Sequence, residues 1–128
     1  MNRHDMRSPL ARALGIGSAK GGVAHWWAQR ASALALVPLG VWFAASIIAH
    51  AGSDHAGVVA WLRTPVAATL MVVLLLSLFH HAALGLQVVI EDYVHGRARF
   101  AVILLMRFSC LLLAVAGIMA TLRIALGP

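Results

Sequence analysis

The chain has 128 residues, of which 62% are hydrophobic and only 11% are charged, and its mean hydropathy is +0.89. Soluble domains carry about 25% charged residues, so we expect one membrane-embedded domain over 1–128 rather than a soluble enzyme. The formal net charge of +6 comes from basic residues that flank apolar stretches, which is a signal of membrane topology and excludes nucleic acid as the expected partner.

Residues 1–24 are polar and basic, and we expect them to form an N-terminal tail on the cytoplasmic side. Within this tail, residues 8–14 predict a short interfacial helix, with Ser8 as N-cap and Pro9 in the first turn. The first long apolar run begins only at residue 31, and no small-residue cleavage site follows it. We therefore expect no cleaved signal peptide.

Three apolar stretches are long enough to cross a bilayer, since about 20 residues of helix cover the roughly 30 Å hydrocarbon core. Residues 31–50 contain no Asp, Glu, Lys or Arg, and Pro38 is expected to kink this span. The second span is expected at about 65–91, opened by Pro65 as its first helical residue, and the third at about 100–122. The sequence thus predicts an all-α membrane protein with three transmembrane helices.

Two connections follow from these spans, and their charges predict the orientation. The first connection, 51–64, is expected to place a half-turn at 58–62 in the membrane interface, and the second covers 91–99. The basic residues expected on one side are Arg3, Arg7, Arg12, Lys20, Arg30, Arg97 and Arg99, against Arg63 and Arg123 on the other. The positive-inside rule then places the N-terminus in the cytoplasm (or matrix) and the C-terminus in the periplasm.

The second span carries ionisable residues, which are costly in a bilayer and usually functional. His81 and Asp92 are eleven residues apart, so on a helix they lie within roughly 20° of one face and about 16 Å apart. Gly85 lies on the same stripe, one turn from His81, and lacks a side chain where a flat or bulky group would approach.

An inward-facing imidazole is a common axial ligand of b-type haem iron, so His81 is the candidate haem ligand. The plain structural alternative is a buried histidine that hydrogen-bonds to a neighbouring helix. His80 is the rival ligand, although it points about 100° away and has no glycine beside it. Arg107, inside the third span, is expected to snorkel, to pair with Asp92 or Glu91, or to bind an anionic lipid.

The pattern H-x-x-x-G from His81, followed by Q-V-V-x-x-D-Y-V-H up to His95, resembles the hydrophobic membrane anchor of succinate dehydrogenase, respiratory complex II. The N-terminal signature of that family is matched by His25-Trp26, Arg30 and Ser32, and the resemblance covers roughly residues 21–125. One departure is local: four residues separate the glutamine from the aspartate here, where other members often have three, although the spacing from His81 to Asp92 still fits the family.

The resemblance implies one haem b, shared with a second anchor subunit that supplies the other axial ligand. It implies that Tyr93 hydrogen-bonds ubiquinone, and the adjacent Asp92 is then suited to relay protons or orient the phenol. Arg30 and His25 become candidates for pairing with haem propionates or for bordering the quinone pocket. The plain alternatives are a headgroup tyrosine at a helix end and a basic, aromatic membrane anchor.

The resemblance also implies peripheral partners, an iron–sulfur subunit and a flavoprotein subunit, and a role in the tricarboxylic acid cycle and respiratory electron transfer. The expected location is the bacterial inner membrane, with the mitochondrial inner membrane as the alternative. This chain alone is expected to have no activity. Two other functions stay open: a haem-free anchor of succinate dehydrogenase or fumarate reductase, and a small proton conductor using His81 and Asp92 as a relay.

Overall fold

The computed structural model describes residues 20–127, and within this range the chain is helical apart from short connections and contains no strand. The helices are α2 (Lys20–His50), α3 (His55–Leu62), α4 (Pro65–Tyr93) and α5 (Arg97–Leu126). The prediction of an all-α protein is confirmed. The short helix predicted at 8–14 lies outside the described residues.

Three of these helices are long and apolar enough to cross a membrane: Gly22–His50, Pro65–Tyr93 and Arg97–Leu126. They correspond to the three predicted spans but extend beyond them, because α2 already begins at Lys20 and α4 continues to Tyr93. The predicted second connection, 91–99, therefore shrinks to the three residues Val94 to Gly96.

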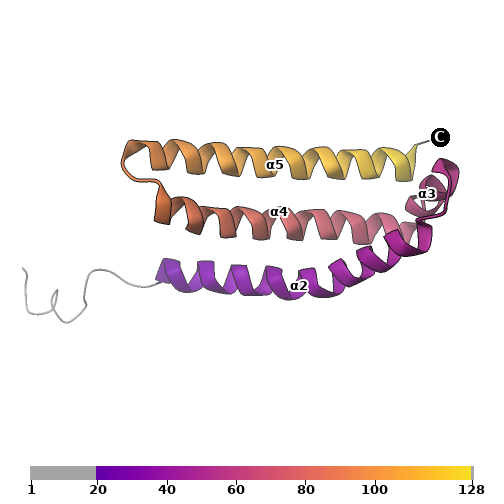
Figure 1. Cartoon of the computed structure of the whole chain (residues 1–128), viewed down its shortest axis with the longest axis horizontal. Helices are drawn as coiled ribbons and strands as arrows, with labels where there is room; N and C mark the ends of the chain where they lie inside the picture. Colours follow the sequence, from indigo (N-terminus) through magenta and orange to yellow (C-terminus); the bar gives the residue numbers. More distant parts are fainter. Residues whose placement is uncertain (1–19, 128) are drawn as a thin grey trace, which may run out of the picture.

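The long helices form one layer, with α4 in the middle and α2 and α5 packed on either side of it (Figure 1). The start of α2, the end of α4 and the start of α5 lie at one end of this layer, and α3 lies at the other end near the C-terminus (Figure 1). Because α4 contacts both neighbours, its side chains are the ones placed to form sites between helices.

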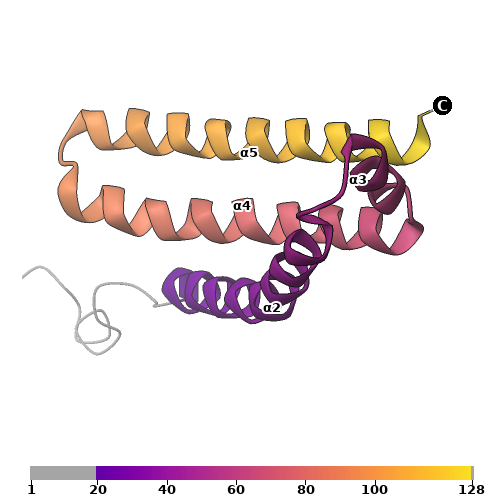
Figure 2. The same cartoon turned by 45° about the vertical axis from the view of Figure 1, so that its right-hand side comes forward.

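The first long helix is bent, as the turned view makes clear (Figure 2). Pro38 lies inside α2, and a proline inside a helix removes a backbone hydrogen bond and crowds the preceding turn. The kink expected from the sequence is therefore present in α2.

The connections show why the helices begin and end where they do. Thr64 caps α4 by accepting a hydrogen bond from the Ala67 N–H, and Pro65 follows at the first turn. At the other end, Gly96 has a φ of 74°, a left-handed conformation that glycine adopts without strain and that reverses the chain within a short turn. The α4–α5 hairpin is thus specified by local chemistry.

The connection 51–64 contains a full short helix, α3, rather than the expected half-turn. Asp54 caps it, since its carboxylate accepts a hydrogen bond from the Gly57 N–H at 2.8 Å. Trp61 on α3 packs against α2, with ring centroids 6.1 Å from Trp42 and 4.9 Å from His50. These ring contacts tie α3 to the far end of α2.

Candidate functional site

His81 lies half-buried between α4 and α2, where both of its ring nitrogens face polar groups of α2. Its Nδ1 is 3.0 Å from the Ser32 Oγ, and its Nε2 is 3.5 Å from the Gln29 Nε2. Ser32 is only 8% exposed. The imidazole is therefore held between two helices rather than turned toward the surface of the layer.

Gly85 on α4 lies next to the side chain of Gln29 on α2. A Cβ added at Gly85 would lie 3.5 Å from the Gln29 Nε2. The structure thus confirms that His81 and Gly85 share one face of α4, and it shows that this face is turned toward α2.

On α2, the facing residues are His25, Gln29 and Ser32, which follow one another at intervals of four and three and so share one face. Two atoms of this stripe, the His25 Nε2 and the Gln29 Oε1, are buried and have no hydrogen-bond partner among the described residues. Unsatisfied buried polar atoms are rare in folded proteins and call for an explanation, such as a group that completes their hydrogen bonds.

Arg30 does not share this stripe. It is exposed, and its guanidinium carbon lies 5.3 Å from the centroid of the Trp26 ring, one helical turn earlier on the same helix. Of the two candidates for haem propionates, the structure therefore places His25 on the face toward α4 and Arg30 on the outer surface of α2.

Asp92 and Tyr93 lie at the last turn of α4, at the end of the layer where α2 begins (Figure 1). Both are exposed, and the Tyr93 side chain is 82% exposed. Among residues 20–127, nothing encloses the Tyr93 side chain.

His80 faces a different environment from its neighbour. It is exposed and lies between two hollows of the surface, one of about 220 Å³ shared with Arg107 and one of about 470 Å³ shared with Ser32. The rival ligand thus points out of the three-helix layer, whereas His81 points into the α2–α4 contact.

Arg107 is linked to Glu91 through Gln87. The Arg107 Nη2 donates a short hydrogen bond to the Gln87 Oε1, and the Gln87 Nε2 donates to the Glu91 Oε1 at 2.7 Å. Pairing with Asp92 or Glu91 was one of the three roles expected for Arg107; the described contacts link it to Glu91 only indirectly, through the Gln87 amide. Sequence reasoning missed this role of Gln87, although its spacing of four from Glu91 is the spacing of paired residues on a helix.

Sequence reasoning also missed Gln29, whose signal was the polar spacing from His25 to Ser32 on an otherwise apolar helix. Within residues 20–127 no group of three or more His, Cys, Asp or Glu side chains could hold a metal ion. A metal bound by His81 would therefore need ligands other than the side chains of residues 20–127.

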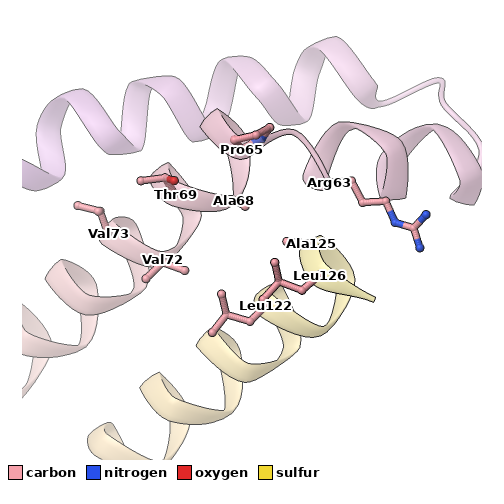
Figure 3. Close-up of a pocket in the computed structure, with 9 residues that line it drawn as sticks. All are labelled: Arg63, Pro65, Ala68, Thr69, Val72, Val73, Leu122, Ala125 and Leu126. Carbon is pink, nitrogen blue, oxygen red and sulfur yellow. The ribbon is translucent and has the colours of Figure 1, made fainter. Parts of the chain in front are cut away.

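A cavity of about 410 Å³ lies at the opposite end of the layer, between the start of α4 and the end of α5 (Figure 3). Its lining is mainly apolar, with residues such as Val72 and Leu122, and the Arg63 side chain extends away from it (Figure 3). The Arg63 Nε donates to the Ile124 carbonyl at 3.3 Å, which ties α5 to the end of α3. This cavity is remote from His81 and Tyr93.

Comparison with known proteins gives one family and several relatives. Residues 4–116 match the family model described as succinate dehydrogenase/fumarate reductase transmembrane subunit. A succinate dehydrogenase hydrophobic membrane anchor subunit from Rickettsia bellii is 34% identical over 91% of this chain and 94% of its own length. The subunit of that name from Paracoccus denitrificans is 28% identical over 94% of this chain and 93% of its own length. No solved structure matches the chain.

Proposed function

The chain belongs to the family of succinate dehydrogenase/fumarate reductase transmembrane subunits, and from this membership we propose that it supplies one axial ligand of a haem b and part of a ubiquinone-reduction site. It is a membrane anchor subunit of succinate dehydrogenase and thus a part of an enzyme complex. The observation that carries the proposal is the position of His81 between two membrane-spanning helices.

The residues around His81 fit the edge of a haem. At Gly85, on the same face, only the side-chain amide of Gln29 lies within contact distance of the missing Cβ. The His25 Nε2 and Gln29 Oε1 are buried polar atoms without a partner in the described chain. The His25 Nε2 would be satisfied by donating to a carboxylate of a ligand, whereas the Gln29 Oε1 needs a hydrogen-bond donor. When bound, the haem would supply a one-electron carrier inside the membrane.

Each residue then has a distinct role toward the haem. His81 would bind the iron from α4 through one imidazole nitrogen. His25, one turn from Gln29 toward the start of α2, would donate a hydrogen bond to a propionate, and Arg30 would do so from the outer face of that helix. The second axial ligand would come from a second anchor subunit.

At the end of α4, Tyr93 would donate its phenolic hydrogen bond to a carbonyl of ubiquinone, and Asp92 beside it would orient the phenol or relay protons. The exposure of Tyr93 supports this role, because the quinone would bind where the iron–sulfur subunit covers this end of the layer. The flavoprotein subunit would dock behind the iron–sulfur subunit, so that electrons from succinate arrive at the quinone. This function belongs to the tricarboxylic acid cycle and respiratory electron transfer.

The relatives are bacterial proteins, and we infer that the chain lies in a bacterial inner membrane with its N-terminus in the cytoplasm.

A haem-free anchor is the second candidate function. The observation that favours it is that both ring nitrogens of His81 already lie near polar groups of α2.

The deciding experiment is a reduced-minus-oxidised absorption spectrum of the purified complex, for the wild type and for His81→Ala and His80→Ala variants. We expect a b-type haem signal that is lost or shifted in His81→Ala and unchanged in His80→Ala. A wild-type complex without haem would support the haem-free anchor. A signal lost only in His80→Ala would transfer the ligand role to His80.

A further inference from the structure

Ser32 is the buried polar residue closest to the Nδ1 atom of His81, and its hydroxyl group has two partners. The Ser32 Oγ donates to the Gln29 carbonyl oxygen at 3.0 Å and lies 3.0 Å from the His81 Nδ1. A hydroxyl group carries a single proton but accepts through two lone pairs. Because its proton is directed to the carbonyl, the hydroxyl is left as an acceptor toward His81.

From this contact we propose that Ser32 is a positioning residue, which accepts the Nδ1–H of His81 and so fixes the imidazole lone pair on Nε2. In a neutral imidazole one nitrogen carries the proton and the other carries the lone pair. The inference rests on the proposed haem function, since only a metal-binding His81 gives the choice of nitrogen a chemical consequence.

A second, longer contact is compatible with the same assignment. The Gln29 Nε2 lies 3.5 Å from the His81 Nε2. A side-chain amide nitrogen can donate hydrogen bonds but cannot accept them. The contact between the Gln29 amide and the His81 Nε2 is attractive when the His81 Nε2 carries a lone pair and repulsive when it carries a proton. Nε2 is also the nitrogen beside Gln29, whose amide covers the position at Gly85. That amide would therefore have to turn aside when Nε2 binds iron.

The consequence for a bound haem concerns its redox potential. A histidine that donates from its second nitrogen to a fixed acceptor is oriented and is more basic toward the metal. A more basic ligand stabilises ferric over ferrous iron. Removing the Ser32 hydroxyl should therefore raise the midpoint potential, with about a threefold to tenfold change in the ferric-to-ferrous ratio, or roughly 30–60 mV for one electron.

The experiment compares Ser32→Ala, Ser32→Thr and Ser109→Ala in the purified complex, with haem content, the electron paramagnetic resonance spectrum of the ferric haem and a redox titration as readouts. Ser109 is the matched control, because its hydroxyl donates to the Leu105 carbonyl within one helix at 2.9 Å, as Ser32 does to Gln29. We expect a raised potential and altered ferric spectrum in Ser32→Ala, recovery in Ser32→Thr, and wild-type values in Ser109→Ala.

A wild-type potential and spectrum in Ser32→Ala would overturn the inference. So would a lowered potential, because it would mean that the hydroxyl donates to Nδ1 instead of accepting from it. Should Ser32→Ala fail to assemble, Ser32→Cys keeps the volume but offers a much weaker acceptor, and the same rise is expected. If His81→Ala loses haem but the Ser32 variants show no shift in midpoint potential, only this inference is rejected. If His81→Ala retains an unaltered haem, the proposed function is rejected.

Discussion

At the scale of single residues, Tyr93 combines a chemically useful group with a position at the very end of a helix. Its side chain is 82% exposed and follows directly on Asp92. A phenol in this position is free to contact a neighbouring subunit or a quinone held against that subunit. Its proposed contribution to catalysis lies in the hydroxyl group alone.

Replacing Tyr93 by Phe should remove that hydroxyl and leave the ring. We expect succinate-to-ubiquinone turnover to fall about 100-fold or more, since a positioned proton donor contributes on this scale. Succinate oxidation by an artificial dye should stay at the wild-type rate, because it bypasses the membrane site. Unchanged quinone turnover in this variant would exclude the phenol from the mechanism.

The pairing of His81 with Gly85 was predictable, because it depends only on the rotation of about 100° per residue in one helix. The contacts of His81 with Ser32 and Gln29 were not, because they depend on how α2 is rotated against α4. That rotation is set by the packing of many apolar side chains, which resemble each other too closely along α2 to reveal the contact face. Ser32 entered the sequence argument only through the family signature.

At the scale of elements, the polar chain from Arg107 through Gln87 to Glu91 connects α5 to α4. Hydrogen bonds between membrane helices contribute modestly, averaging about 0.6 kcal/mol and reaching about 1.7 kcal/mol. The Arg107 guanidinium is charged, so we place this contact toward the upper end of that range.

A double-mutant cycle with Gln87→Leu and Arg107→Leu measures this contact. We expect a coupling free energy of about 1–1.7 kcal/mol in the reversible unfolding of the detergent-solubilised complex. The control cycle pairs Gln87→Leu with Ser109→Ala, whose hydroxyl bonds within its own helix, and should be additive. Additivity in both cycles would mean that the Arg107–Gln87 contact adds nothing to stability.

The helix boundaries illustrate a limit of reasoning from hydropathy. The charge-free stretch 31–50 locates the part of α2 that crosses the hydrocarbon, but the helix also includes the more polar residues 20–30 at the membrane interface, which hydropathy does not mark as a span. The start of α4 was predicted correctly, since Pro65 is a local signal. The length of α3 was underestimated from the sequence, which indicated only a half-turn of apolar residues. The Asp54 cap and the contact of Trp61 with Trp42 stabilise a longer helix.

At the scale of the whole molecule, the start of α2 and the α4–α5 turn lie at one end of the helical layer, and the C-terminus lies at the other end (Figure 1). The distribution of Lys and Arg predicts that the first of these ends faces the cytoplasm. Alkaline phosphatase fused to the C-terminus should then be active, and green fluorescent protein fused there should be dark. Fluorescence together with an inactive phosphatase would show the opposite orientation.

The unbroken course of α4 from Pro65 to Tyr93 also constrains how the family's chain length can vary. Inserting one residue between His81 and Tyr93 would turn everything beyond it by about 100° and shift it by about 1.5 Å. The two parts of the helix that we propose to bind iron and quinone would then face different directions. Natural insertions and deletions in proteins of this kind should therefore accumulate in the connection 51–64, outside the helical segment that joins His81 to Tyr93.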